Sequence, residues 1–531
     1  MKKIAGLLLA ACTFFGGLGL SACGKGNYSD CTVVLYKEYN GIVGEEAQKV
    51  KEALEKKFEK DTGEKIDLVI EPTPTSMLAD KVSGALSAPS VRVDAIVAHN
   101  SSDSIVTQMI GDEDEVQDIT NLVATHAPNY VQITNTGEDK TPYRKGLSDG
   151  KLYAMCSADK NSIFAMMINR NHMANTSFNP DEYDIANEGY KSLTISQFTQ
   201  LLYELRENNE SVTRPLAAYP YDIEYFIAPV FDNAGYVHMQ MVGDKIYPAY
   251  ATDSYLKVLE YERMLQTEKL WIENPINATS SERDFKAGKA SIFISYPDVE
   301  QEIDIVRELK ETTGDDCIMI APLAKDDGTV NGNARHETAF LGMVVPQKGE
   351  NTELLLRFLN WMYADPANYE IAKYGIEGEH WVKTTTVDGK PGYAYPAAKK
   401  AEYEKKPAYD GLYCFLPNVN VSDRAYTDYT AKESAWVAAV GQFKTYPAAG
   451  YADEGMNIPA IPRTERKLLS LSTQMGNEYV KMRAYGWSDA AIPEGKTLAD
   501  LHATFMANVN DKYAAYIDWL NGEYQKIIAS R

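Results

Sequence analysis

The pattern of apolar and polar positions near the start of the chain predicts strands that alternate with helices. Residues Thr32 to Tyr36 form a β-branched and apolar run, which is typical of a buried strand. From Glu45 to Lys60 apolar residues recur every three or four positions among lysines and glutamates, so we expect an amphipathic helix. The next predicted elements are a strand at 65–70, a helix at 76–86 and a strand at 93–98. This order predicts a parallel sheet covered by helices.

Polar and aromatic residues directly follow two of these predicted strands. The segment YKEYNG covers 36–41, and AHNSSD covers 98–103. Because ligands of open parallel sheets bind at the carboxyl ends of strands, both segments are candidates for ligand contacts. A helix beginning near Asp103 would give Asn100 and Ser101 the alternative role of helix caps. The candidates at this edge are Tyr39, Asn40, His99, Asn100 and Asp103.

Residues 1–22 have the pattern of a secretory signal peptide. Lys2 and Lys3 supply the positive start, and small residues precede the expected cleavage site. The apolar run from Ile4 to Leu20 is too short and too rich in glycine for a typical membrane span. We therefore expect the rest of the chain to be exported.

The end of this signal resembles the lipobox of bacterial lipoproteins in the segment Leu20-Ser21-Ala22-Cys23. The resemblance implies that Cys23 receives a lipid and becomes the first residue after cleavage. Two or more acyl chains hold a protein on a membrane stably, whereas one chain is marginal. The polar residues 23–30 would then be a tether, and the protein would be extracytoplasmic and anchored to the cell membrane. The alternative is an ordinary secretion signal with an incidental cysteine.

The composition describes an acidic globular chain of 531 residues, with 53 lysines and arginines against 75 acids and a net charge of −22. This charge argues against nucleic acid or anionic lipid as a partner of the globular part. No second apolar run approaches 18 residues, so no other membrane span is expected. Four cysteines could form disulfides outside the cytoplasm, and the sequence does not choose a pairing. They are Cys31, Cys156, Cys317 and Cys414.

Motifs of catalysis are missing from the sequence. It contains no G-x-S-x-G and no H-E-x-x-H, and the segment at 494–497 lacks the first glycine of a phosphate-binding loop. The acidic segment 111–118 lacks the alternation and glycine of a calcium-binding EF-hand loop. Paired carboxylates of a glycosidase stay an open alternative, because separation in sequence does not give separation in space. We expect a binding protein with no catalytic residues, no metal and no cofactor.

Several segments, in their order along the chain, resemble ABC-transporter extracellular solute-binding proteins of the class that includes the maltose-binding protein. The resemblance extends from residue 31 to about 385 and is fainter beyond. No single segment is specific, and their order carries the resemblance. The segments are EALEKKFEKDTGEKIDLVI with VDAIVAHNSSD, then 148–173, 192–205, 284–300, 336–363 and YGIEGEHW at 374–381.

The resemblance implies an α/β, two-lobed periplasmic-binding-protein-like fold of type II. Each lobe is expected to hold a mostly parallel sheet wrapped by helices, and hinge strands join the lobes around one solute. The chain is expected to cross between lobes near 156–161 and 321–334. The expected division is 31–157 in lobe 1, 158–322 in lobe 2, 323–370 back in lobe 1, and 371–531 mainly in lobe 2 with a helix-rich C-terminal extension.

The second lobe holds further candidates for solute contacts. Sugars offer hydroxyl groups and a weakly apolar ring face, which suit carboxylates and aromatic rings with a polar edge. The chain has 35 tyrosines against 15 phenylalanines, and YPYDIEYF at 219–226 concentrates three tyrosines with two acids. Its position resembles the place where sugar-binding relatives carry an acid and an aromatic residue; the alternative is a surface loop. The candidates are Tyr221, Asp222 and Tyr225, then Tyr296 and Asp298 after a strand, Asp159 at the first crossing, and Trp381, which could equally be a core residue.

The resemblance implies that the protein captures a sugar and delivers it to an ABC permease. We expect the sugar to be an oligosaccharide, and the protein to be a lipid-anchored monomer. A sensory lipoprotein, or a binder of peptides or amino sugars on the same fold, is the alternative. A carbohydrate-active enzyme is the third and least favoured class.

Overall fold

The computed structural model divides into two compact units, each with its own sheet and core. Unit 1 comprises 1–157, 340–384 and 393–423, and unit 2 comprises 158–339, 385–392 and 424–531. The residues described are 28–41, 43–99, 105–110, 114–135, 143, 146–148, 150–158, 165–235, 239–273, 281–294, 299–334, 340–386, 389–418, 424–446, 461, 465–487 and 492–529.

Unit 1 is built on a five-stranded sheet in the order β2-β1-β3-β14-β6. Strand β1 pairs in parallel with β2 and with β3, as the sequence pattern predicts, and β14 runs antiparallel to β3. The strands are β1 (Thr32–Glu38), β2 (Asp67–Thr73), β3 (Ala95–His99), β14 (Phe340–Val344) and β6 (Ala154–Ala158). A small antiparallel hairpin of β4 (Leu147–Ser148) and β5 (Lys151–Leu152) directly precedes β6 in the sequence.

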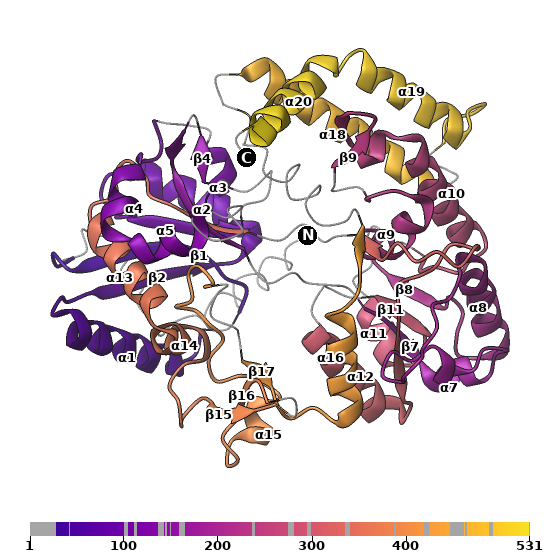
Figure 1. Ribbon diagram of the computed structural model, residues 1–531, viewed down its shortest axis with the longest axis horizontal. Coiled ribbons are helices and arrows are strands. Elements are labelled where there is room, and N and C mark those ends of the chain that lie inside the picture. The colour runs from indigo at the N-terminus through magenta and orange to yellow at the C-terminus, as the bar shows by residue number, and fades with distance from the viewer. Residues whose placement is uncertain are drawn as a thin grey trace, which may run out of the picture. The chain divides into compact units, whose positions relative to one another are not determined.

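Helices pack on both faces of this sheet, because alternate residues of a strand point to opposite faces. Val33 and Leu35 of β1 join one core cluster, whereas Val34 and Tyr36 join another. Figure 1 shows the helices that supply these clusters. The first cluster is lined by α1 (Glu45–Thr62), α4 (Thr120–His126), α5 (Pro128–Asn135), α13 (Thr352–Ala364) and α14 (Pro366–Tyr374), and the second by α2 (Thr75–Ser87) and α3 (Ile105–Ile110).

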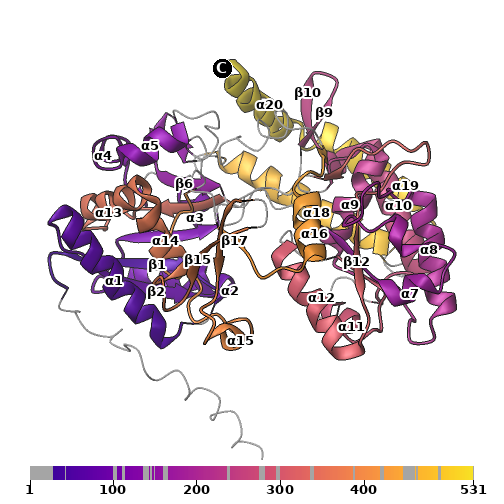
Figure 2. The ribbon, with the colours of Figure 1, turned by 60° about the horizontal axis from the view of Figure 1, so that its bottom comes forward.

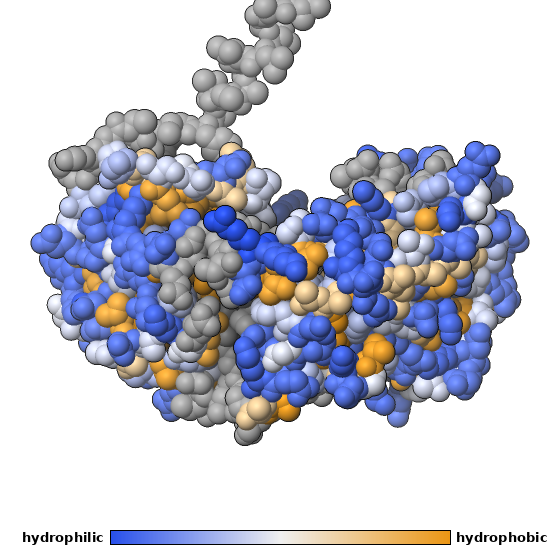
Figure 3. Space-filling view, turned by 90° about the horizontal axis from the view of Figure 1, so that it is seen from above, coloured by the Kyte–Doolittle hydropathy of each residue, from blue (hydrophilic) through white to orange (hydrophobic). Residues whose placement is uncertain are grey.

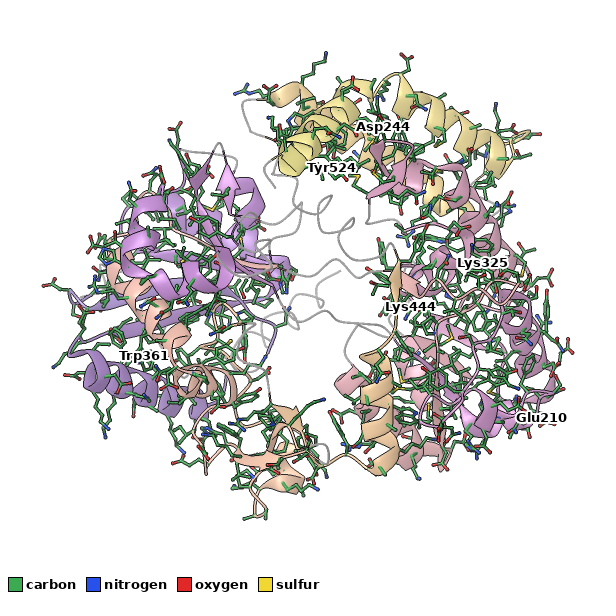
Figure 4. All side chains as sticks on the ribbon, in the orientation of Figure 1. Glu210, Asp244, Lys325, Trp361, Lys444 and Tyr524 are labelled. Atoms are coloured by element: carbon green, nitrogen blue, oxygen red, sulfur yellow. The ribbon has the colours of Figure 1, made fainter. Side chains whose placement is uncertain are left out.

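Helix α1 illustrates how local sequence and packing agree in unit 1. Its apolar stripe is buried, and the helix ends where Gly63 adopts a left-handed conformation with φ of 77°. Trp361 of α13, labelled in Figure 4, donates its indole N–H to Oδ2 of Asp61 at 3.0 Å and packs edge-on against Phe58. The predicted helix 45–60 is therefore confirmed and runs two residues further.

Unit 2 is built on a four-stranded sheet in the order β12-β7-β11-β8. Strands β11 and β8 are parallel, but β7 runs antiparallel to both of its neighbours. The expectation of a mostly parallel sheet is therefore wrong for this unit. Its strands are short and buried on both faces, so residue pattern alone does not reveal their direction. They are β12 (Cys317–Ile320), β7 (Met166–Asn169), β11 (Ile292–Ile294) and β8 (Leu216–Ala218).

The helices of unit 2 surround this sheet and continue into a helical C-terminal part. Helices α11 and α12 contact each other and lie side by side in both ribbon views (Figure 2). Helix α18 contacts α10, α19 and α20. The helices are α7 (Arg170–Ala174), α8 (Ile195–Asn208), α9 (Pro220–Ile227), α10 (Asp253–Thr267), α11 (Ser281–Lys286), α12 (Val299–Thr313), α16 (Ala431–Val440), α18 (Arg466–Trp487), α19 (Leu498–Asn510) and α20 (Ala514–Ala529).

Two helices of unit 2 show how local sequence sets their start and their buried face. Thr194 and Gln197 form a capping box at the start of α8. The last helix buries Ile517, Leu520 and Tyr524 as an apolar stripe, and Tyr524 reaches the Sδ atom of Met241 at 4.0 Å. Figure 4 shows Tyr524 on the side of α20 near the hairpin whose turn carries Asp244. That hairpin consists of β9 (Met239–Val242) and β10 (Lys245–Pro248); the remaining short elements are α15 (Lys400–Tyr403), β13 (Asn333–Ala334), β15 (Val382–Thr385), β16 (Pro391–Ala394), β17 (Ala425–Tyr426), β18 (Thr445–Tyr446), and the 3-10 turns Pro180–Glu182, Ala228–Phe231 and Ala249–Ala251.

The unit boundaries differ in part from the expected lobes. The first boundary falls after Ser157, inside the expected crossing at 156–161. The second falls before Phe340 rather than at 323, and 371–384 and 393–423 belong to unit 1 rather than to the second lobe. The unit of these segments is decided by contacts far away in sequence, such as those of Lys37 with the carbonyls of Gly411 and Leu412.

Cys31, Cys156, Cys317 and Cys414 are all free thiols. Hydrophilic side chains cover most of the face in Figure 3, and hydrophobic ones form small patches between them. Among the described residues, no helix combines the length and apolarity needed to cross a bilayer.

Candidate functional site

The carboxyl ends of β1 and β3 lie side by side in unit 1, as the parallel register places Lys37 opposite Val97. The backbone N–H of His99 donates to Oε2 of Glu38 at 2.9 Å, and its Nδ1 lies 3.1 Å from Oε1 of the same carboxylate. The sequence candidates Tyr39, Asn40 and His99 therefore come together at one edge of the sheet.

Glu38 is the charged centre of this edge. Burial opposes ionisation of its carboxylate, but hydrogen bonds from His99 and from the hydroxyl of Thr75 outweigh that effect and lower its pKa to about 2. Glu38 therefore stays ionised at any physiological pH and fixes the start of α2 against the end of β3.

Asn40 has a structural role at the same edge. Its Oδ1 accepts from the backbone N–H of Thr75 at 3.2 Å, and its Nδ2 donates to the hydroxyl of Thr75 at 2.9 Å. Both ends of the side-chain amide are thus engaged at the first residue of α2. A solute contact by Asn40 stays a prediction.

Tyr39 lies over a buried lysine. The Nζ of Lys37 is 5.5 Å from the centroid of the Tyr39 ring, and the Lys37 residue is only 5% exposed. The Tyr39 hydroxyl donates to the backbone carbonyl of Asp410 at 3.1 Å. Burial lowers the pKa of Lys37 to about 8, with nearby Cys414 and Asp410 acting in the opposite sense. The ring of Tyr39 is half-buried and supported by a cation.

The second group of candidates lies on α9 of unit 2, which begins directly after the carboxyl end of β8. Proline at the first helical position and a tyrosine before it start the helix there. Tyr221 is 46% exposed, whereas Asp222 and Tyr225 are each 6% exposed. The cluster is therefore split by the helix: Tyr221 faces solvent and the ring of Tyr225 packs in the hydrophobic core.

Arg483 of α18 supports Tyr221 from within the unit. Its guanidinium carbon lies 4.1 Å from the centroid of the Tyr221 ring and 4.9 Å from that of Trp487. Its Nη2 lies 2.5 Å from Oε1 of Glu224, and Arg483 is only 2% exposed. A buried ion pair thus stands behind an exposed aromatic ring.

A third acid completes this buried network. Burial and the neighbouring Glu224 raise the pKa of Glu262 well above its usual value, which favours its protonated form. The indole of Trp487 donates to Oε2 of Glu262 at 2.9 Å. Arg483 and Glu224 thus form one ion pair behind Tyr221, to which the protonated form of Glu262 adds no charge.

Asp222 is an acid without a full set of partners. Its Oδ2 is buried and has no hydrogen-bond partner among the described residues. Burial raises the pKa of Asp222 to about 7, although a hydrogen bond from the backbone N–H of Tyr219 and the charge of Arg483 favour the ionised form. Asp222 therefore titrates near neutral pH next to Tyr221.

The remaining predicted residues divide into two groups. Trp381 is 2% exposed, and its indole N–H donates to the carbonyl of Gly375 at 3.0 Å, which is the core role left open by the sequence. Its solute contact stays untested. Cys23, Asn100, Asp103, Asp159, Tyr296 and Asp298 lie outside the described residues.

Sequence reasoning missed Lys37, Asp410 and Arg483. Lys37 lies inside an apolar strand, where a lone lysine is a usable signal because a buried cation needs acceptors. Asp410 and Arg483 lie in parts of the chain with no distinctive local pattern, and only the fold brings them to the tyrosines.

A group of possible metal ligands in unit 1 consists of Glu46, Glu379 and His380. Nδ1 of His380 accepts from the backbone N–H of Ile376 at 2.9 Å, so the neutral ring carries its proton on Nε2, 3.0 Å from Oε2 of Glu46. A metal on Nε2 would displace the hydrogen bond to Glu46 and move the ring proton to Nδ1. That N–H would then face the backbone N–H of Ile376. The arrangement favours a structural His–Glu contact over a metal centre.

Solved structures of similar fold are transport proteins from bacteria. The substrate-binding protein FusA of S. pneumoniae, solved with kestose, matches at 14% identity with a TM-score of 0.66, covering 94% of this chain and 100% of that one. The N-glycan transport solute-binding protein NgtS of Streptococcus pneumoniae matches at 14% identity and 0.60, covering 94% and 99%. A solute-binding protein of Bifidobacterium longum infantis described as HMO-binding matches at 12% and 0.64, covering 93% and 98%.

Sequence comparison agrees with the fold. No curated protein matches the chain in sequence. The family model described as bacterial extracellular solute-binding protein matches residues 43–369, which is more than half of the chain. The expected two-lobed α/β solute-binding-protein fold is confirmed, and the chain belongs to the bacterial extracellular solute-binding protein family.

Proposed function

We propose that this protein captures an oligosaccharide outside the cytoplasm and delivers it to an ABC permease. The observation that carries the proposal is the exposed ring of Tyr221, held from behind by Arg483 at the carboxyl end of β8. An aromatic ring of fixed orientation beside a carboxylate is the surface that a sugar ring and its hydroxyls fit. Tyr39 over Lys37 repeats this arrangement in unit 1.

The relatives support a carbohydrate as the solute. Among the proteins of similar structure, one is an N-glycan transport protein, one is an alginate-binding protein and one was solved with kestose. Because Arg483 is paired with Glu224, the cation behind Tyr221 is already balanced, which favours a neutral solute over an anionic one there. Tyr221 is the preferred contact in unit 2, and Asp222 and Tyr225 stay predicted contacts.

Membrane anchoring forms a second part of the proposal. It rests on the segment Leu20-Ser21-Ala22-Cys23, with residues 1–22 as the signal and 23–30 as the tether. A protein held near the membrane surface by lipid meets its permease without diffusing away. Delivery by hinge closure, a monomeric state and the absence of catalysis are expectations from the family.

A thermal-shift screen of the purified protein tests the proposed solute class. The panel contains neutral oligosaccharides, amino sugars and short peptides. A ligand at about 100 times its dissociation constant adds about 2.7 kcal/mol of stability, which a melting curve resolves. A shift with oligosaccharides supports the proposal. A shift with peptides or amino sugars alone overturns the solute class but not transport, and no shift at all favours a sensory lipoprotein that reads a partner.

A further inference from the structure

The exposed carboxylate of Asp410 lies beside the ring of Tyr39. A Cβ atom built on Gly41 would lie 2.5 Å from Oδ2 of Asp410 and 2.6 Å from Cζ of Tyr39. The carboxylate and the ring thus border the same small space beside residue 41, where only a glycine leaves room. This places an acid next to an aromatic ring at the carboxyl edge of the unit 1 sheet.

Lys37 holds this acid in position. Its ammonium donates to the carbonyls of Gly411, Leu412 and Cys414 at 3.1, 2.8 and 2.8 Å. Three acceptors match the three donors of an ammonium group, so Lys37 is saturated and ties the segment after Asp410 to β1. Asp410 therefore comes from a distant part of the chain but is anchored to the strand that carries Tyr39.

The side chain of Asp410 has unused acceptor capacity. Its carboxylate makes no hydrogen bond or ion pair with any residue that the structure describes, while the residue itself is exposed. Partial burial raises its pKa, against the opposing influence of Lys37 and Lys373. A partly desolvated carboxylate without partners gains when a hydroxyl donates to it.

We propose that Asp410 is a solute-contacting residue that accepts hydrogen bonds from the hydroxyls of a sugar ring stacked on Tyr39, and that it selects neutral sugars against uronates. The inference rests on the proposed function. A uronate carboxylate brought to this subsite would face the Asp410 carboxylate. Lys37 has no N–H left to donate to the uronate, because its three donors already serve backbone carbonyls, so only the longer-range charges of Lys37 and Lys373 would offset the repulsion.

Calorimetric titration tests the inference with kestose and a mannose N-glycan as neutral probes and an alginate trisaccharide as the anionic probe. The proteins are the wild type, Asp410→Ala, Asp410→Asn and the control Asp518→Asn, whose side chain is exposed on α20. We expect the wild type to bind a neutral probe at least tenfold more tightly than alginate. We expect Asp410→Ala to weaken neutral binding at least tenfold, Asp410→Asn to reduce the preference over alginate, and the control to change nothing.

A second variant separates position from chemistry. Gly41→Ala keeps every functional group but pushes the Asp410 carboxylate and the Tyr39 ring apart, so its affinity for the neutral probes should fall. The melting temperature of Asp410→Ala is measured as a control for folding and should stay that of the wild type. Neutral binding within twofold of wild type in Asp410→Ala, or equal affinity of the wild type for alginate, overturns the inference and leaves the proposed function standing. If no sugar binds the wild type, the proposed function fails and this inference fails with it.

Discussion

The guanidinium carbon of Arg483 lies 4.1 Å from the centroid of the Tyr221 ring, so α18, from the helical C-terminal part, stands directly behind a tyrosine at the start of α9. The cation is buried and paired with Glu224, whereas the ring is exposed. An aromatic ring held in this way loses little conformational freedom when a solute stacks on it. The C-terminal extension therefore takes part in shaping the unit 2 surface.

Arg483→Met should destabilise the protein strongly. The substitution leaves Glu224 as a buried charge without its main partner, and breaking such a pair costs about 3 to 5 kcal/mol. Urea denaturation followed by circular dichroism measures the loss. The matched control is Arg283→Met, whose side chain is 76% exposed and should cost less than about 0.5 kcal/mol. Equal losses in both variants would show that the buried pair contributes nothing.

Asp222 should make stability depend on pH between about 4 and 7. Its pKa is about 7 in the folded protein and about 3.9 in an unfolded chain, so in this window the folded state keeps a proton that the unfolded state has lost. The contribution is complete below pH 4 and disappears as the pH rises through 7.

Asp222→Asn tests this dependence because the amide stays neutral at every pH. Its free energy of unfolding relative to wild type should rise by up to about 4 kcal/mol between pH 4 and pH 8. Denaturant titrations at several pH values measure the difference. Asp518→Asn, at an exposed position, should track the wild type. A constant difference between Asp222→Asn and wild type would argue that Asp222 ionises normally in the fold.

Lys37→Met should loosen the segment that follows Asp410. Three backbone carbonyls lose their donor, and an unsatisfied buried group costs about 1 to 3 kcal/mol. Hydrogen exchange should become faster at the amides of 411–415 and stay unchanged in unit 2. The control is Lys406→Met, where the side chain is exposed. Unchanged protection at 411–415 would mean that other contacts hold this segment.

Cys23→Ser should release the protein from the membrane, since the thiol is the predicted site of lipid attachment. Cell fractionation with immunoblotting and the intact mass of the purified protein report the change. Cys31→Ser removes a different free thiol and should stay in the membrane fraction. Membrane association of Cys23→Ser equal to wild type would rule out the anchor.

The sequence predicts a helix or strand well when the residues of that element alone reveal its type and its ends. The helix from Glu45 shows its stripe and its glycine stop, and Thr194 with Gln197 marks the start of α8. The parallel pairing around β1 also followed, because strand and helix alternate there. In unit 2 the reversed direction of β7 is set by its neighbours and leaves no trace in its own four apolar residues.

The candidate site was predicted in part. Tyr39 and His99 do meet at one edge, because parallel strands bring their carboxyl ends together. On α9 the sequence concentrated tyrosines and acids but could not tell which would face solvent. Burial of Tyr225 and exposure of Tyr221 depend on helical phase against the core. Arg483 and Asp410 reach these tyrosines through contacts across hundreds of residues, which local patterns do not encode.

Native mass spectrometry tests the central claim most directly, because it reports the mass and stoichiometry of whatever the protein retains. The purified protein is incubated in parallel with a mixture of neutral oligosaccharides and a mixture of short peptides. The account predicts a one-to-one complex with an oligosaccharide that is weakened in Tyr221→Ala and in Tyr39→Ala. Retention of a peptide alone, or of oligosaccharide undiminished in both variants, would contradict it.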